Sequence, residues 1–175
     1  VTLRAAVASG LVTQQSIESH TKLKVMKFAC EEVVRQEDTV ETVYPYTVAW
    51  FVALDEFNKR KATDGAWEVW RTIAPEDVVR WWRIALPGLT EVSNYRRINL
   101  LNRKTDLQIG VDHQHIDRQM NNLFTRETLT NLAPAEVYKH FEEIHPFYDG
   151  NGRVGKIIYN WCLMSLHDPQ LPPKF

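Results

Sequence analysis

The stretch that decides the fold of this chain is HPFYDGNGRVGK, residues 145–156. Apolar residues recur at helical spacing on both sides of it: Val137, Tyr138, Phe141 and Ile144 before, and Val154, Ile157, Ile158, Trp161 and Cys162 after. Glycine and asparagine within it favour a turn. The sequence therefore predicts two buried helices joined by a short loop, Pro146–Gly150, with the second helix beginning near Asn151.

The rest of the chain is also mostly helical in its spacing. The expected helices are one with Leu23, Met26, Cys30, Val33 and Val34 on its apolar stripe, one from about Pro45 to a polar loop at Lys59–Gly65, one from Pro75 to Leu86, one around residues 116–124, and one opened by Pro134. Prolines 169, 172 and 173 predict a non-helical tail. Both cysteines, Cys30 and Cys162, are expected to be buried free thiols, as in a reducing compartment.

A change to strand spacing sets one segment apart. Leu107, Ile109 and Val111 alternate with polar or small residues, which predicts a β-hairpin over Ile98–Val111. The basic residues Arg96, Arg97, Arg103 and Lys104 are expected to form a solvated face of this hairpin, with docking of an acidic target or contact with nucleotide phosphates as the functional alternative. His113 and His115 are expected to start a helix.

Composition narrows the class of protein. The 175 residues are 44% hydrophobic and 25% charged, which is typical of one globular domain spanning residues 1–175. A net charge of −1 argues against a nucleic-acid partner. No apolar run is long enough for a transmembrane helix. Residues 1–20, expected to be helix plus loop, are too polar for a secretory signal, so a cytoplasmic location is expected.

The loop has the composition of an anion-binding site. Amides of Gly150, Asn151 and Gly152 would lie at a helix N-terminus, where unpaired donors and the helix dipole favour phosphate. Arg153 and Lys156 are three residues apart, so these two cations are expected to share one face of the helix.

Two further residues of the loop could supply chemistry. Near a bound phosphate, the carboxylate of Asp149 is a natural Mg²⁺ ligand. His145 titrates near neutral pH and could act as a general base.

A nucleotide-binding P-loop is the competing interpretation, because Gly150–Lys156 formally matches G-x-x-x-x-G-K. A P-loop continues with Ser or Thr, whereas Ile157 follows here. It also needs a preceding strand, whereas residues 137–144 have helical spacing. Both departures argue against it.

The stretch resembles the Fic motif, H-P-F-x-[DE]-G-N-G-R-x-x-R, at every defined position except the last, where Lys156 replaces Arg. Tyr95-Arg96 before the predicted hairpin resembles the flap of this family. The resemblance covers roughly Pro75–Pro173, after N-terminal helices in residues 1–74. It implies an all-α, Fic-like helical bundle with one β-hairpin flap.

The resemblance also implies an activity. A Ser, Thr or Tyr hydroxyl of a target protein, deprotonated by His145, would attack the α-phosphate of ATP and take up AMP. Asp149 would hold Mg²⁺, and the amides of residues 150–152 together with Arg153 would bind phosphates. Phe147 would fix the loop in the core, and the hairpin would align the target chain. Lys156 could neutralise the β- or γ-phosphate, less directionally than Arg.

Three alternatives stay open at this point. Doc toxins carry Lys in place of the second motif glycine and phosphorylate their target; Gly152 favours AMP transfer instead. Another nucleotide could replace ATP. Lys156 also fits a degenerate, non-catalytic module that binds nucleotide or protein. A DNA-binding module is disfavoured by the charge.

Inhibition in this family often uses a helix with the pattern [ST]-x-x-x-E-[GN]. The nearest match, Thr72–Asp77, contains Pro75 and reads as a helix start. Inhibition of a toxin-like chain is therefore expected to come from a separate antitoxin-like protein.

Overall fold

A computed structural model describes residues 19–65, 67–89 and 94–175. Most of the segment predicted as helix plus loop, residues 1–20, lies outside the described residues. The α-helices are α2 (Ser19–Arg35), α3 (Val43–Asp64), α4 (Pro75–Ala85), α5 (Ile116–Leu123), α6 (Arg126–Asn131), α7 (Pro134–Ile144) and α8 (Asn151–Cys162). Two short strands are β1 (Leu100–Leu101) and β2 (Gln108–Ile109), and 3-10 turns are η2 (Val40–Thr42), η3 (Val69–Thr72), η4 (Pro87–Leu89) and η5 (His113–His115).

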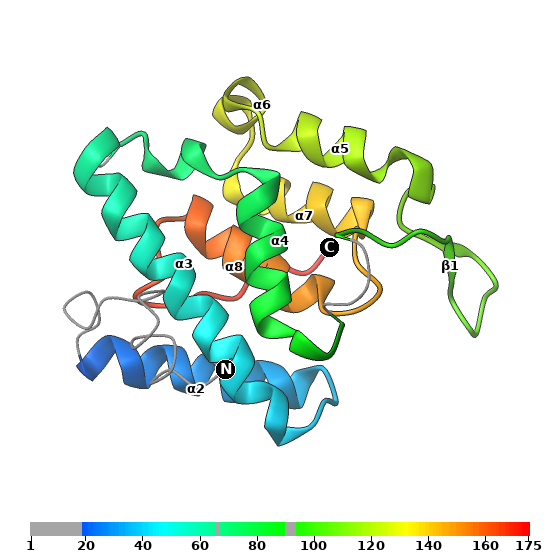
Figure 1. Ribbon diagram of the computed structural model, residues 1–175, viewed down its shortest axis with the longest axis horizontal. Helices are drawn as coiled ribbons and strands as arrows, with labels where there is room; N and C mark the ends of the chain where they lie inside the picture. Colours follow the sequence, from blue (N-terminus) through cyan, green and yellow to red (C-terminus); the bar gives the residue numbers. More distant parts are fainter. Residues whose placement is uncertain (1–18, 66, 90–93) are drawn as a thin grey trace.

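Helix α8 lies at the centre of the bundle, in contact with α7, α3 and α4. In Figure 1 it runs behind α4, between α3 and α7. Its residues are buried almost throughout, including Val154, Ile157 and Trp161. The sequence predictions of an all-α bundle and of a buried helix after the glycine-rich turn are confirmed.

The hairpin extends away from the helices, at the right of Figure 1. β1 and β2 pair antiparallel with Leu100 opposite Ile109 and Leu101 opposite Gln108. The prediction of one hairpin is confirmed for the described residues, although its paired part is shorter than Ile98–Val111. Helix α6 was not predicted, because it is short and carries only one buried residue, Leu129.

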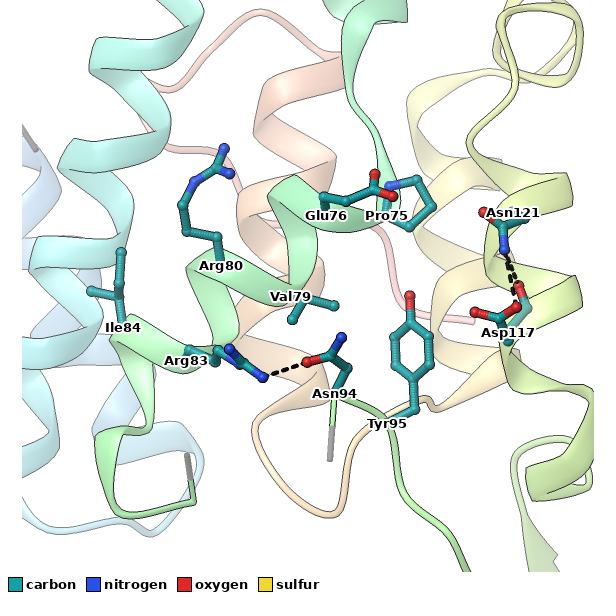
Figure 2. Close-up of a pocket in the computed structure, with 10 residues that line it drawn as sticks. All are labelled: Pro75, Glu76, Val79, Arg80, Arg83, Ile84, Asn94, Tyr95, Asp117 and Asn121. Atoms are coloured by element: carbon teal, nitrogen blue, oxygen red, sulfur yellow. Dashed lines mark hydrogen bonds between the residues drawn. The ribbon is translucent and has the colours of Figure 1, made fainter. Parts of the chain in front are cut away.

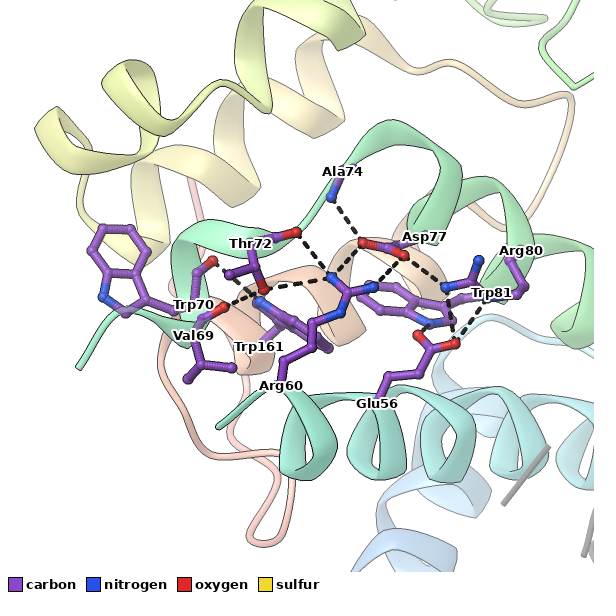
Figure 3. A network of polar contacts seen from close by, with 10 residues as sticks. All are labelled: Glu56, Arg60, Val69, Trp70, Thr72, Ala74, Asp77, Arg80, Trp81 and Trp161. Carbon is purple, nitrogen blue, oxygen red and sulfur yellow. Dashed lines mark hydrogen bonds and ion pairs between the residues drawn. The ribbon is translucent and has the colours of Figure 1, made fainter. Parts of the chain in front are cut away.

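Helix α3 continues through most of the segment predicted as a polar loop, Lys59–Gly65, so that prediction is wrong. Arg60 explains the extension. Its guanidinium donates to both carboxylate oxygens of Asp77 at 2.8 and 2.7 Å, and to the carbonyl of Thr72 at 2.9 Å. Figure 3 shows this network between α3 and the start of α4. Polar residues here are helical because they bind a neighbouring element.

Helix α2 was predicted, but its buried face was not. Val25, Phe28, Ala29, Glu32 and Val33 are buried, whereas Leu23, Met26, Cys30 and Val34 are exposed. Of the five residues of the predicted stripe, only Val33 is in the core. Apolar residues surround much of this helix, so periodicity alone could not select the face. The prediction of a buried Cys30 is wrong, and that of a buried Cys162 is confirmed.

None of the helices in the described ranges is both long enough and apolar enough to cross a lipid bilayer.

Candidate active site

Helix α7 places His145 at its C-terminal end. The helix begins with Pro134, and the Glu136 carboxylate accepts a hydrogen bond from the Ala133 amide at 2.7 Å. It ends where His145 adopts a left-handed conformation, with φ 50° and ψ 62°. The amide of His145 still donates to the Phe141 carbonyl at 3.0 Å. The chain therefore turns sharply at this imidazole and enters the loop.

Packing against the core fixes the loop that follows His145. Phe147 is fully buried and stacks on Trp82, with ring centroids 4.5 Å apart and planes 4° apart. The indole nitrogen of Trp82 donates to the Asp149 carbonyl at 2.9 Å. The side chain of Asn151 accepts from the Phe147 amide and donates to the Phe147 carbonyl, both at 2.9 Å. The loop is therefore fixed to α4 and α8, as expected for Phe147.

Among the described residues, no hydrogen-bond acceptor is found for the first amides of α8. Gly150 precedes the helix with φ 79°, and a β-carbon there would collide with Leu86. Within the part of the chain that the structure describes, no side chain caps this helix. The amides of Asn151, Gly152 and Arg153 lie in the first turn, where an α-helix offers no internal acceptor, and no described side chain accepts from them. This end of α8 can bind an anion through its backbone.

The environment of His145 favours its neutral form. Burial lowers the pKa of the imidazole first, and the nearby Arg96 guanidinium lowers it further. A hydrogen bond to the backbone of Glu142 and the charge of Asp149 oppose these effects without reversing them. A neutral imidazole at neutral pH can accept a proton, which is what a general base requires.

Asp149 is the accessible carboxylate of the loop. Its side chain is 68% exposed; one oxygen accepts from the Gly150 amide at 2.6 Å, and the other lies 3.4 Å from the Arg153 guanidinium. No group of three or more His, Cys, Asp or Glu side chains in the described residues could cage a metal ion. One exposed carboxylate next to an anion site suits Mg²⁺, which takes few protein ligands and completes its shell with phosphate and water.

The two cations of the motif are both buried and do not share partners. Arg153 is 3% exposed and forms an ion pair with Asp38 at 2.6 Å. Lys156 has a side chain 10% exposed; its ammonium lies 2.7 Å from Glu32 and 3.2 Å from the Gly152 carbonyl. A phosphate that approached either cation would meet a cation already bound to a carboxylate.

Sequence reasoning missed both acids. Glu32 is fully buried on α2, and Asp38 follows that helix. Tyr46 on α3 also contacts the start of α8, since its hydroxyl donates to the Arg153 carbonyl at 3.0 Å. The only signal in the sequence is a run of acids around the end of α2, and nothing local connects it to residues more than a hundred positions later.

Two more predictions concern residues outside the loop. The described structure places Arg97, Arg103 and Lys104 at the surface, as expected, but Arg96 is 2% exposed, so the prediction of a solvated or phosphate-facing Arg96 is wrong. His113 begins a 3-10 turn capped by Asp112, which confirms a helix start.

Two cavities flank the candidate site. One of about 510 Å³ is lined by Glu32, Gln36, Glu142 and Lys156, so it opens beside the last motif residue. Another, of about 550 Å³, lies between α4 and α5 and is not lined by residues 145–156. Figure 2 shows Tyr95 between Glu76 and Asp117 in this second cavity. The ring centroids of Tyr95 and Phe147 are 5.9 Å apart, so the cavity adjoins the loop on the side where Phe147 is buried.

The segment before the loop is helix α7, which excludes the strand that a P-loop requires. No relative was found among the curated proteins. A model of the Fic/DOC family matches residues 72–163. The matched range does not include Glu32 or Asp38, the two acids that pair with Lys156 and Arg153. It also ends before Pro173, where the resemblance was expected to end. Because it covers more than half of the 175 residues, the chain belongs to the Fic/DOC family.

Proposed function

We propose that this chain is a protein adenylyltransferase, which transfers AMP from Mg-ATP to a Ser, Thr or Tyr hydroxyl of a target protein. Members of the Fic/DOC family commonly transfer a nucleotide to proteins. The observation that carries the proposal is the position of a partly buried His145, whose pKa is lowered, six residues before the start of α8 at Asn151.

In the proposed reaction, His145 accepts the hydroxyl proton as the oxygen attacks the α-phosphorus. A bond forms between that oxygen and the phosphorus, and the bond to the β-phosphate oxygen breaks. Pyrophosphate leaves with the electron pair. Amides of residues 151–153 would stabilise the negative charge on the phosphates.

The residues present fit Mg²⁺, and Asp149 would hold it. A bound Mg²⁺ would neutralise phosphate charge. Asp149 keeps its carboxylate at the rim of the loop, because one oxygen is fixed by the Gly150 amide and the backbone carbonyl by Trp82.

We further propose that the helices before residue 75 belong to the same domain and restrain the site. Glu32 and Asp38 compete with phosphate for Lys156 and Arg153, which supports this. A Glu32→Gln variant keeps a polar side chain but removes the charge, so it should bind Mg-ATP more tightly in calorimetry. An unchanged affinity would argue that Lys156 has no part in nucleotide binding.

The same ion pairs favour a second candidate, a non-catalytic module that binds nucleotide or protein. In that case the cations serve the structure, and turnover is absent. Tight binding of Mg-ATP without any transfer to candidate targets would support this alternative.

Transfer is tested with ATP labelled at either the α- or the γ-phosphate, incubated with the chain and a lysate, followed by mass spectrometry of labelled proteins. We expect label from the α-position only, with a mass increase of one AMP. His145→Ala should reduce transfer by about 100-fold or more, since it removes the general base. His140→Ala is the matched control, because His140 is exposed on the same helix. Label from the γ-position alone would show a kinase instead.

A further inference from the structure

Arg96 is a buried cation whose hydrogen bonds go to backbone carbonyls. Its side chain donates to the carbonyl of His145 at 2.8 Å and to that of Ile98 at 2.9 Å. Its second terminal nitrogen donates to the Val111 carbonyl and lies 3.5 Å from the Ile144 carbonyl. Among the described residues, no carboxylate forms an ion pair with it.

These acceptors belong to two different parts of the molecule. Ile98 and Val111 flank the two strands of the hairpin, whereas Ile144 and His145 end α7. Backbone bonds run in parallel: the Arg96 amide donates to the Pro146 carbonyl at 2.9 Å, and the Val111 amide to the Ile144 carbonyl at 3.3 Å. The guanidinium therefore joins the base of the hairpin to the turn that carries His145.

The turn needs such support. His145 has a positive φ of 50°, a conformation that costs a non-glycine residue about 1–2 kcal/mol unless its surroundings impose it. Gly110 at the hairpin base lies so close that a β-carbon there would be 2.6 Å from the His145 β-carbon and 2.9 Å from the Arg96 guanidinium. The three residues form one tightly packed joint.

We propose that Arg96 is a positioning residue for His145: its guanidinium fixes the backbone of the catalytic turn against the base of the hairpin. The proposal rests on the function above only in taking His145 as the base. In this role Arg96 acts through the backbone carbonyls that it binds, without a contact to nucleotide or target. The five donors of a guanidinium can serve several carbonyls at once, which a lysine ammonium cannot do with the same geometry.

A positioning role differs from a purely structural one in its effect on the imidazole. Among the described residues, the groups that shift the pKa of His145 are Arg96, the Asp149 carboxylate and the Glu142 backbone. Because Arg96 lowers the pKa of His145, its removal raises that pKa, and the base form then appears only at a higher pH.

The test compares Arg96→Met and Arg96→Lys with a neighbouring control, Arg97→Met, whose side chain is exposed. NMR follows titration of the His145 ring, identified by its absence in His145→Ala, and calorimetry gives the affinity for Mg-ATP. We expect the midpoint of the titration to move to higher pH in Arg96→Met, to stay near the original value in Arg96→Lys, and not to move in Arg97→Met.

Transfer provides the second measurement. Both Arg96 variants should lower kcat at least about tenfold, because a small displacement of a catalytic group has a large effect on rate. Their affinity for Mg-ATP should stay within about twofold, because the phosphates would bind the start of α8. Arg96→Lys, which keeps the charge, separates loss of geometry from loss of charge if Arg96→Met does not fold.

Weaker Mg-ATP binding with an unchanged His145 titration and kcat would overturn the proposal and make Arg96 a phosphate ligand. Lower thermal stability with no change in titration or kcat would overturn it in favour of a purely structural role. Failure of the unmodified chain to transfer AMP would contradict the proposed function instead, and the NMR titration would still decide whether Arg96 controls His145.

Discussion

Helices α7 and α8 follow each other in the chain but begin in opposite ways. At α7, proline occupies the first position and the Glu136 carboxylate accepts the preceding amide. α4 begins similarly, with Asp77 accepting the Ala74 amide at 2.9 Å. α8 begins with neither a proline nor an acidic side chain, and no described side chain caps it; the Asn151 side chain instead binds the backbone of Phe147. An uncapped helix that is stabilised by packing keeps its first amides available for a ligand.

The largest expected effect comes from removing that packing. Phe147→Ala should lower the free energy of unfolding by about 3–5 kcal/mol, because a fully buried ring stacked on Trp82 leaves a cavity. Chemical denaturation followed by tryptophan fluorescence measures this loss. Phe147→Leu should lose less, since it refills part of the volume. A loss below about 1 kcal/mol would contradict the role of Phe147 in fixing the loop.

The second largest loss of stability should come from removing the two hydrogen bonds between the Asn151 side chain and the backbone of Phe147. Asn151→Ala leaves the buried amide and carbonyl of Phe147 unpaired, at a cost of about 2 kcal/mol. Asn151→Asp keeps the acceptor but sets a buried carboxylate oxygen against the Phe147 carbonyl, so it should be at least as destabilising as Asn151→Ala. Urea unfolding of the three proteins gives the order directly. Equal stability of all three would show that water replaces the hydrogen bonds of Asn151 with no loss of stability.

A charge at the second position of each helix sharpens the comparison between α7 and α8. Gly152→Asp has room, because the nearest atom to its β-carbon would be the flexible end of Gln36 at 3.3 Å. It should weaken Mg-ATP binding at least about tenfold by repelling the phosphates. It should not destabilise the helix, because an acid near an N-terminus is favourable.

Ala135→Asp is the matched control, at the equivalent position of α7. It should leave the affinity for Mg-ATP unchanged. Calorimetry and thermal unfolding of both variants are the measurements. Equal affinities for the two variants would show that the start of α8 does not bind the phosphates.

The smallest effect is expected at the capped helix. Glu136→Ala removes the acceptor of the Ala133 amide and should cost about 1 kcal/mol of stability. Neither Mg-ATP binding nor transfer should change, because α7 contributes its other end to the site. A change in affinity at this position would mean that the two helix starts are coupled.

Most helices and the hairpin could be predicted from the sequence. Apolar residues at Ile116, Met120 and Leu123 fall on one face and are all buried in α5. Prolines 75 and 134 marked two helix starts correctly. The prediction failed at α2 and at the end of α3. There, local spacing was ambiguous or polar residues were helical because of distant partners such as Asp77.

The loop itself was also recognisable, but the surroundings of its residues were not. Nothing near Arg96 in the sequence distinguishes it from exposed Arg97, yet Arg96 is buried under the carbonyls of a turn 49 residues later. Cys30 has apolar neighbours in sequence and is nevertheless exposed. Burial of a single side chain depends on what packs against it, which spacing does not report.

The sequence by itself determined the order of the helices other than α6, the hairpin, the glycine-rich turn between α7 and α8, and the family. These follow from local spacing, from proline and glycine, and from one contiguous motif. The tertiary structure alone decided which acids neutralise the motif cations and which arginine supports His145. The Arg153–Asp38 pair spans 115 residues, and contacts over such separations form only when helices that are remote in sequence pack together.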